Sequence, residues 1–361
     1  MIKIVTILGA RPQFVKAAVL SRIIKIHAQI EEVIVHTGQH YDANMSNLFF
    51  EEMQLPKPAY NLNINGLSHG AMTGQMLEKI EQILMIEKPN AVVVYGDTNS
   101  TLAGALAAKK LNLKLIHIEA GLRSFNMEMP EEINRIITDR ISDLLVCPTT
   151  TAMANLKNEG FDALNTKVVK CGDIMKDAVT FYGELSEQKS SIFTDLKLEN
   201  NGFVLATIHR QENTDDLAKL KSIFEALESI HKEKQVVLPI HPRTRKILEE
   251  AKLNYGITFI NPVGYFDMLA LLKSCAQVIT DSGGLQKEAY FNKKYCIIAR
   301  EETEWMELVE HNFATLVGSD KDQLISAFHN FKNKQSDFSM DLYGNNVGEQ
   351  IHKEIVSILN E

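Results

Sequence analysis

Short runs of apolar, mostly β-branched residues alternate along this sequence with longer segments of helical periodicity. Continuous apolar runs of this kind are typical of parallel strands whose sheet is covered by helices on both faces. The runs lie at residues 2–8, 33–36, 91–95, 115–118, 144–147, 168–171, 203–208, 236–240, 257–260, 278–279, 296–299 and 315–317, and helical periods lie between them at 16–26, 69–86, 101–111 and 217–231. Twelve strands exceed what one open sheet usually holds. The sequence therefore predicts an α/β protein with two six-stranded halves.

The chain length fits two domains that each bury a core of their own. The sequence has 361 residues, and a domain typically takes about 100–200. We expect a first domain over residues 1–171 and a second over 172–345. A last helical segment, residues 346–361, is expected to pack back on the first domain.

Composition and charge exclude several classes of protein. Lys and Arg number 38 against 46 Asp and Glu, a net charge of −8, and the isoelectric point is near 5.8. Nucleic-acid binding needs a basic surface, so nucleic acid is not expected as a partner. The most apolar stretch, 91–108, contains Asp97 and Asn99, so we expect no membrane span. The four cysteines lack metal-site spacing and lie in or beside apolar runs, which favours free, buried thiols in a cytoplasmic protein.

Polar clusters follow the expected strands instead of scattering along the chain. They occupy 9–13, 36–40, 96–100 and 119–123 in the first half, and 209–213, 241–243, 281–284 and 300–305 in the second. Open parallel α/β sheets bind ligands outside the carboxyl ends of their strands. Two such edges that face one another would form a single cleft, so the pattern predicts an enzyme.

One cluster has the features of a phosphate site. In Asp281-Ser-Gly-Gly-Leu-Gln-Lys-Glu288 a strand leads into a small turn and then a helix, where backbone N–H groups and the positive helix end favour a phosphate. Glu288, two turns on, is placed to accept from a ribose diol. In the structural alternative, the Ser-Gly turn is an ordinary helix N-cap with no ligand. Further candidate donors to a diphosphate are His209, His241, Arg11 and Lys16. In the structural alternative, each histidine is a helix cap or a polar partner in the core, and Lys16 is a surface lysine.

Three carboxylates lie at or just beyond the ends of first-half strands: Asp97, Glu119 and Glu131. Desolvation and like-charge neighbours in a cleft raise a carboxyl pKa toward neutrality, as a general base requires. In the structural alternative, Asp97 caps a helix and the two glutamates pair with Arg123 and Arg135. No cluster has zinc spacing, so no metal is expected.

Taken together, these clusters resemble the non-hydrolysing UDP-N-acetylglucosamine 2-epimerases. The matching pieces, in order, are Gly9-Ala-Arg-Pro, His36-Thr-Gly-Gln-His, Gly96-Asp-Thr, His117-Ile-Glu-Ala-Gly-Leu-Arg, Pro130-Glu-Glu-Ile-Asn-Arg, His209-Arg, Thr280-Asp-Ser-Gly-Gly-Leu-Gln and Thr303-Glu304. The resemblance implies a GT-B fold, with two Rossmann-like domains flanking a cleft and the second binding the nucleotide, a homodimer, and no cofactor. It also implies the reaction: UDP leaves C1 as the C2 proton is removed, and then re-adds to the 2-acetamidoglucal as C2 is protonated from the other face.

The resemblance also assigns roles to residues. It implies acid–base or leaving-group roles for Asp97, Glu119, Glu131 and His209, and UDP binding by Arg11, Lys16, His241, Ser282, Gly283, Gly284 and Glu288. It further implies sugar contacts for Gln39, His40, Arg123, Asn134, Arg135, Arg210, Glu304 and Trp305. The division of labour among the three carboxylates stays open.

The identity of the sugar is less sharply defined. Trp305 stands where well-known members carry arginine, and Met268 where they carry an aromatic residue. Several positions, Gln13 and Phe14 among them, resemble the branch that acts on UDP-2,3-diacetamido-2,3-dideoxy-glucuronate for surface polysaccharides. The alternatives are a GT-B glycosyltransferase with a UDP-sugar donor, a hydrolysing 2-epimerase, and a catalytically inactive UDP-sugar sensor, since fold does not fix function.

Overall fold

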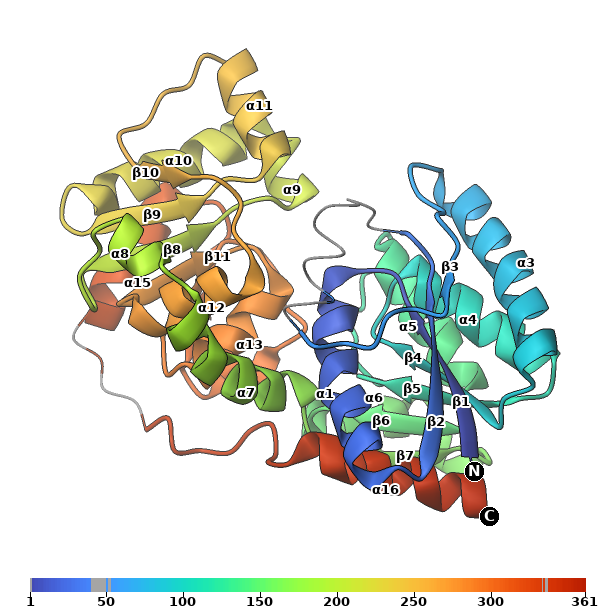
Figure 1. Ribbon diagram of the computed structural model, residues 1–361. Helices are drawn as coiled ribbons and strands as arrows, with labels where there is room; N and C mark the ends of the chain where they lie inside the picture. Colours follow the sequence, from blue (N-terminus) through green and yellow to red (C-terminus); the bar gives the residue numbers. More distant parts are fainter. Residues whose placement is uncertain (1, 40–49, 51–52, 333, 335–336) are drawn as a thin grey trace. The chain divides into compact units, whose positions relative to one another are not determined.

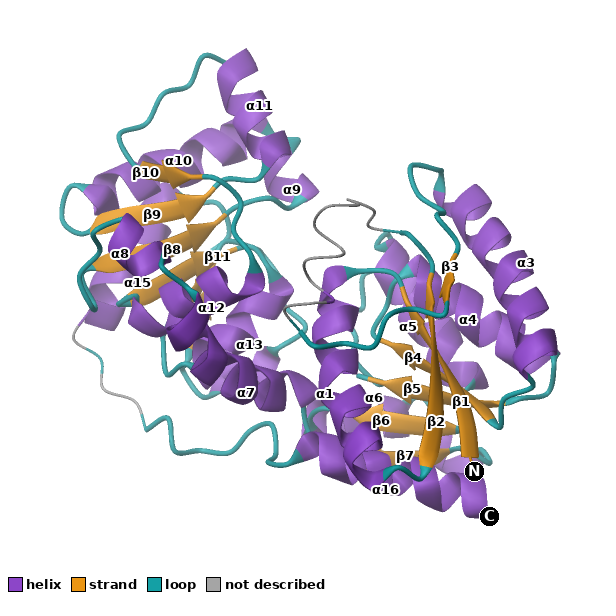
Figure 2. Ribbon diagram, in the orientation of Figure 1, coloured by secondary structure: helices purple, strands orange, loops and turns teal. Residues whose placement is uncertain are grey.

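The computed structural model describes residues 2–39, 50, 53–332, 334 and 337–361. Within these residues the chain forms two compact units, one of residues 1–178 with 342–361 and one of residues 179–341. Each unit is built on one parallel sheet that carries helices (Figures 1 and 2). The α/β class with two Rossmann-like halves is confirmed.

The first unit has a seven-stranded sheet in the order β3-β2-β1-β4-β5-β6-β7. Its strands are β1 (Ile2–Leu8), β2 (Ile30–His36), β3 (Tyr60–Asn61), β4 (Ala91–Tyr95), β5 (Lys114–Ile118), β6 (Leu144–Cys147) and β7 (Lys167–Lys170). The six predicted runs are all present, but the expectation of six strands was wrong. The two-residue β3 pairs with the end of β2 and is too short to show a strand pattern in the sequence.

Helices cover both faces of this sheet. They are α1 (Arg11–His27), α3 (His69–Glu87), α4 (Asn99–Lys110), α5 (Pro130–Ile141), α6 (Thr150–Asn158), the 3₁₀ turn η1 (Phe161–Ala163), the start of α7 (Ile174–Lys189), and α16 (Val347–Asn360). Side chains of α3 and α4 form one core with alternate residues of β1 and β4. The last helix, α16, lies against α1, where Gly348 meets Val19 and Ile23. Lys167 of β7 pairs with Glu354 of the same helix at 2.8 Å.

The second unit has a six-stranded sheet in the order β10-β9-β8-β11-β12-β13. Its strands are β8 (Phe203–Thr207), β9 (Gln235–Pro239), β10 (Thr258–Ile260), β11 (Gln277–Thr280), β12 (Cys296–Ile298) and β13 (Ala314–Leu316). The helices are α8 (Ile192–Asp195), α9 (Gln211–Thr214), α10 (Leu217–His231), α11 (Pro242–Glu250), α12 (Tyr265–Ser274), α13 (Gly283–Phe291), α14 (Met306–Glu310) and α15 (Lys321–Lys332). Helices α10 and α15 share a core with β8, β9 and β12.

The strand orders fix where a ligand belongs in each unit. In the first sheet the chain runs outward from β1 through β2 and β3, then returns to β4 on the other side of β1. The second sheet has the same reversal between β8 and β11. A doubly wound sheet opens a crevice at such a switch point, beyond the carboxyl ends of the two strands. The turns after β1, β4, β8 and β11 hold the predicted clusters.

Candidate functional site

At the switch point of the first unit, Lys16 forms an ion pair with Glu119. Lys16 lies in the second turn of α1 and Glu119 directly follows β5, and both side chains are about nine-tenths buried. Glu119 has a φ of +71°, a left-handed conformation that is uncommon for residues other than glycine. Such strain gathers at functional sites. A Cβ on Gly96 would lie 3.1 Å from Oε2 of Glu119, so the carboxylate reaches the turn after β4.

Asp97, in that same turn, is held from α5. Arg135 donates from Nε and Nη2 to Oδ2 of Asp97, at 3.0 and 2.8 Å, and the Asn134 amide donates to the Asp97 carbonyl at 2.8 Å. The Asp97 side chain stays 34% exposed, which leaves it open to a ligand. Thr98, not Asp97, caps α4. The third carboxylate, Glu131, lies half-buried in the first turn of α5, and its side chain makes no hydrogen bond or ion pair to the described residues.

The turn after β2 joins the same edge through Gln39. Its side-chain oxygen accepts from the backbone N–H and the hydroxyl of Ser100, at 3.0 and 2.7 Å. His40, predicted beside it, lies outside the described residues. Arg11 begins α1 and is partly exposed. Arg123 is buried, and its guanidinium is bonded to Asp139 and to both carboxylate oxygens of Glu159.

In the second unit, Asp281 organises the turns after β8 and β11. Its buried carboxylate accepts from the backbone N–H groups of His209 and Arg210 and from the amide of Asn213, at 2.9–3.1 Å. Nδ1 of His209 lies 3.3 Å from the same carboxylate, and the His209 side chain is 41% exposed. The imidazole is therefore oriented at its inner nitrogen and open at the outer one. His241 is exposed, caps α11, and its ring lies 6.2 Å from that of His209.

The turn that begins α13 has the open backbone expected of a phosphate site. Ser282 is the N-cap residue and its side chain makes no cap hydrogen bond. A Cβ on Gly284 would meet nothing within 4 Å, and one on Gly283 would lie 3.6 Å from Glu304 and 3.7 Å from Arg210. Glu288 is buried further along α13. The turn thus offers backbone N–H groups at a helix start, with a guanidinium close by.

Glu304 and Trp305 lie next to this turn, where buried charges hold them. Arg300 is fully buried and bonds to Glu304 and Glu212. Burial lowers the pKa of Arg300, but the two carboxylates outweigh that effect and raise it. Lys287 places its ammonium 3.6 Å from the centre of the Trp305 ring, a close cation–π contact. The indole is 4% exposed and is packed against α13.

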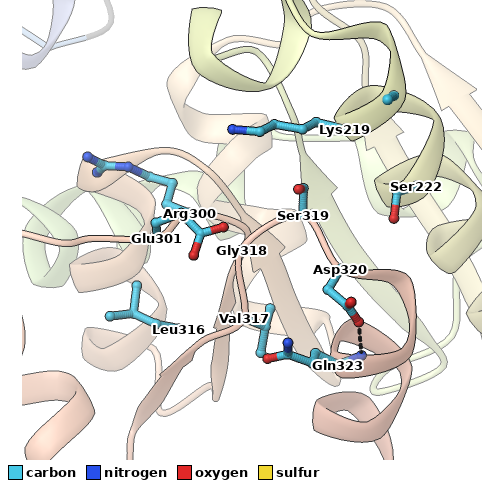
Figure 3. Close-up of a pocket in the computed structure, with 11 residues that line it drawn as sticks. Lys219, Ser222, Arg300, Glu301, Leu316, Val317, Gly318, Ser319, Asp320 and Gln323 are labelled. Atoms are coloured by element: carbon cyan, nitrogen blue, oxygen red, sulfur yellow. Dashed lines mark hydrogen bonds between the residues drawn. The ribbon is translucent and has the colours of Figure 1, made fainter.

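An open hollow of about 500 Å³ lies at the carboxyl ends of β12 and β13. Figure 3 shows Lys219 of α10 reaching over it, with Glu301, Ser319 and Asp320 around it. Arg300, which bonds to Glu304, is one of its lining residues. None of the predicted site residues lines it. Charges of both signs line this hollow, with Lys219 and Arg300 on one hand and Glu301 and Asp320 on the other.

The four cysteines are as the sequence predicts. All four cysteines are free and buried, and burial raises the pKa of Cys171 and of Cys275 to about 12. Among the described residues no group of histidine, cysteine and acidic side chains could hold a metal ion. None of the described helices is long and apolar enough to cross a membrane.

Sequence reasoning did not identify the buried residues that hold these turns in place. Gln13 accepts from the backbone N–H groups of Gly9 and Ala10 and donates to Tyr95. Glu132 accepts from Arg135 and from the backbone of the turn at 124–125. Asp139 and Asp281 play similar parts. For Glu132 and Asp139 the available signal was an acidic residue on the buried face of an amphipathic helix, and this signal does not reveal the partner.

Three comparisons relate the chain to known proteins. The family model described as UDP-N-acetylglucosamine 2-epimerase matches residues 22–359. The UDP-2,3-diacetamido-2,3-dideoxy-D-glucuronate 2-epimerase of Pseudomonas aeruginosa is 51% identical over 95% of this chain and 96% of its own length. The UDP-N-acetylglucosamine 2-epimerase of Methanocaldococcus jannaschii is 42% identical over 97% of both chains. A crystal structure of the latter with UDP-GlcNAc and UDP superposes with a TM-score of 0.91, covering 99% of this chain and 100% of that one, at 41% identity.

Proposed function

The chain belongs to the UDP-N-acetylglucosamine 2-epimerase family, and from this premise we propose that it inverts C2 of UDP-2,3-diacetamido-2,3-dideoxy-glucuronate without hydrolysis or metal. The observation that carries the choice of sugar is the 51% identity, over nearly the whole chain, to the Pseudomonas aeruginosa enzyme named for that substrate. UDP-N-acetylglucosamine is the second candidate, because the Methanocaldococcus jannaschii relative is named for it. Trp305 and the Lys287 ammonium against its ring are proposed to shape the part of the sugar site where the uronate and N-acetylglucosamine differ.

The proposed reaction breaks and re-forms two bonds of the sugar. A carboxylate takes the C2 proton while the C1–O bond to UDP breaks, which leaves a C1=C2 double bond in the enzyme-bound 2-acetamidoglucal. UDP then adds back at C1 while a proton enters C2 from the opposite face. Asp97, Glu119 and Glu131 are the proposed proton carriers, since inversion needs groups on both faces of the sugar.

The second unit is proposed to bind the leaving nucleotide. The open turn Ser282–Gly284 and the start of α13 supply N–H groups for the diphosphate, and His209 stabilises the charge that builds up on UDP. Asp281 supports this role because it orients the inner nitrogen of His209. Arg11, Lys16, His241 and Glu288 complete the proposed nucleotide set, and Gln39, His40, Asn134, Arg135, Arg210 and Glu304 the sugar set.

The molecule is proposed to act as a cytoplasmic homodimer in surface polysaccharide synthesis. Free thiols fit a reducing compartment. Phe125, Met127, Ile133 and Ile137 are large apolar side chains that stay 36–75% exposed in one segment of the first unit. An exposed apolar patch of this kind marks an interface in many proteins.

Proton NMR in D2O tests the proposed function directly. The protein is incubated separately with UDP-2,3-diacetamido-glucuronate and with UDP-N-acetylglucosamine, and the C2 epimer and deuterium at C2 are followed. Epimer with deuterium from the uronate, at a rate at least ten times that from UDP-N-acetylglucosamine, is the expected result. The reverse ratio would assign the other sugar. Free sugar with no UDP-linked epimer would identify a hydrolysing enzyme, and no exchange with either substrate would remove the epimerase proposal.

A further inference from the structure

A completely buried imidazole links the two catalytic turns of the first unit. His117 lies in β5, two residues before Glu119, and is 0% exposed. Its Nδ1 is 2.7 Å from Oδ1 of Asp139, and its Nε2 is 2.7 Å from the carbonyl oxygen of Gly96. Gly96 immediately precedes Asp97. The ring is therefore bonded at both nitrogens to oxygen atoms that accept hydrogen bonds.

This geometry determines how many protons the site holds. A carbonyl oxygen can only accept, so Nε2 must carry a proton. Nδ1 then either donates to an ionised Asp139 or accepts from a protonated one. Oδ2 of Asp139 already accepts from the Gly121 N–H at 3.1 Å and from the Arg123 guanidinium at 2.7 Å. Two donors at this oxygen, one of them a charged guanidinium, stabilise the ionised carboxylate. Asp139 is thus the anion and His117 the cation.

The surrounding charges agree with that assignment. Glu159 pairs with the other side of Arg123, so His117, Asp139, Arg123 and Glu159 sum to zero only when the imidazole is charged. The Cys147 thiol on β6 adds no charge, because burial raises its pKa. Toward the site, the groups nearest to the Gly96 turn are Glu119 with its partner Lys16, and Asp97.

We propose that His117 is a permanently protonated imidazolium that acts as a positioning residue for the epimerase reaction. Its Nε2–H fixes the carbonyl of Gly96 and so the Asp97 turn, and its charge, buried below that turn, adds a positive potential at this edge of the sheet. The proposal rests on the proposed function only for its effect on turnover. The protonation state itself can be measured in the absence of any substrate.

Nitrogen NMR of the wild-type protein tests the charge. In protein labelled with ¹⁵N, the His117 ring is assigned through bonds from the backbone of β5 and followed from pH 6 to pH 9. Both ring nitrogens are expected to remain protonated throughout this range, and the exposed ring of His311 is followed in the same spectra for comparison. One unprotonated ring nitrogen on His117 at pH 7.5 would overturn the proposal.

The variant His117→Gln tests the effect on catalysis, with His311→Gln as the matched control. Glutamine can donate to one acceptor but brings no charge, so the acidic limb of the kcat profile should move up by about one pH unit. The control should keep the wild-type profile. A lower kcat with an unmoved limb would reduce His117 to a packing role and overturn its electrostatic part. If neither protein turns over a UDP-sugar, the proposed function fails, and the NMR result on His117 still stands.

Discussion

Asp97 combines two properties that a proton-transfer residue needs. Arg135 fixes one oxygen of its carboxylate, while a third of the side chain remains exposed. The change Asp97→Asn keeps the shape and the hydrogen bond to Arg135 but removes the basic oxygen pair. General acid–base catalysis contributes about 10²–10⁴-fold, so we expect the rate of C2 epimer formation to fall at least 100-fold while UDP binding by calorimetry stays within about twofold.

A surface carboxylate supplies the control for this change. Asp162 is exposed in η1, and Asp162→Asn should leave both turnover and UDP binding at wild-type values. Normal turnover in Asp97→Asn would rule out proton transfer by this residue. A loss of UDP affinity equal to the loss of rate would instead indicate a binding role.

At the scale of elements, the start of α13 can be tested with a single methyl group. Gly284 is exposed, and its added Cβ would meet no atom within 4 Å. Gly284→Ala should therefore fold, and stabilise the helix by up to about 1 kcal/mol, since alanine has the higher helix propensity. If the diphosphate lies against this backbone, the methyl group occupies its place. We expect the Kd for UDP, measured by calorimetry, to rise at least tenfold.

An exposed glycine inside another helix provides the comparison. Gly74 in α3 is also exposed with open space around its Cβ position, and Gly74→Ala should give a similar gain in thermal stability with unchanged UDP affinity. An unchanged Kd in Gly284→Ala would show that the diphosphate does not approach this turn.

The strands could be predicted because each buried strand appears in the sequence as a local run of apolar residues. The partners of buried polar side chains could not be predicted because they come from distant segments of the chain. The run at β4 was placed at its observed bounds, Ala91–Tyr95, from local pattern alone. His117 of β5 and Asp139 of α5 lie 22 positions apart in the sequence and meet only in the folded chain. Arg123 reaches Glu159 across 36 positions. Spacing along the chain contains no information on such pairs, so the sequence located the functional edge but not its buried supports.

The return of the chain terminus to the first unit makes the stability of the whole molecule depend on pH. The rings of His27 in α1 and His352 in α16 stack with their centres 4.6 Å apart, and His27 bonds to Glu349 at 2.8 Å. Burial lowers the pKa of His352, and the nearby charge of His27 lowers it further, against the opposing effect of Glu349. Below the ordinary pKa of about 6.5 the unfolded chain therefore binds a proton at this histidine more readily than the folded one.

The sign of the effect follows from this difference in proton binding. Stability contributed by the neutral His352 is complete above about pH 6.5 and is lost as the pH falls toward the lower folded pKa. We expect the free energy of unfolding, measured with urea and circular dichroism, to decrease from pH 7.5 to 5.5 more in the wild type than in His352→Gln. Other titrating groups are common to both proteins and cancel in this difference. His311→Gln, on the second unit, should follow the wild type, and an identical pH slope in His352→Gln would contradict the coupling of α16 to α1 through this pair.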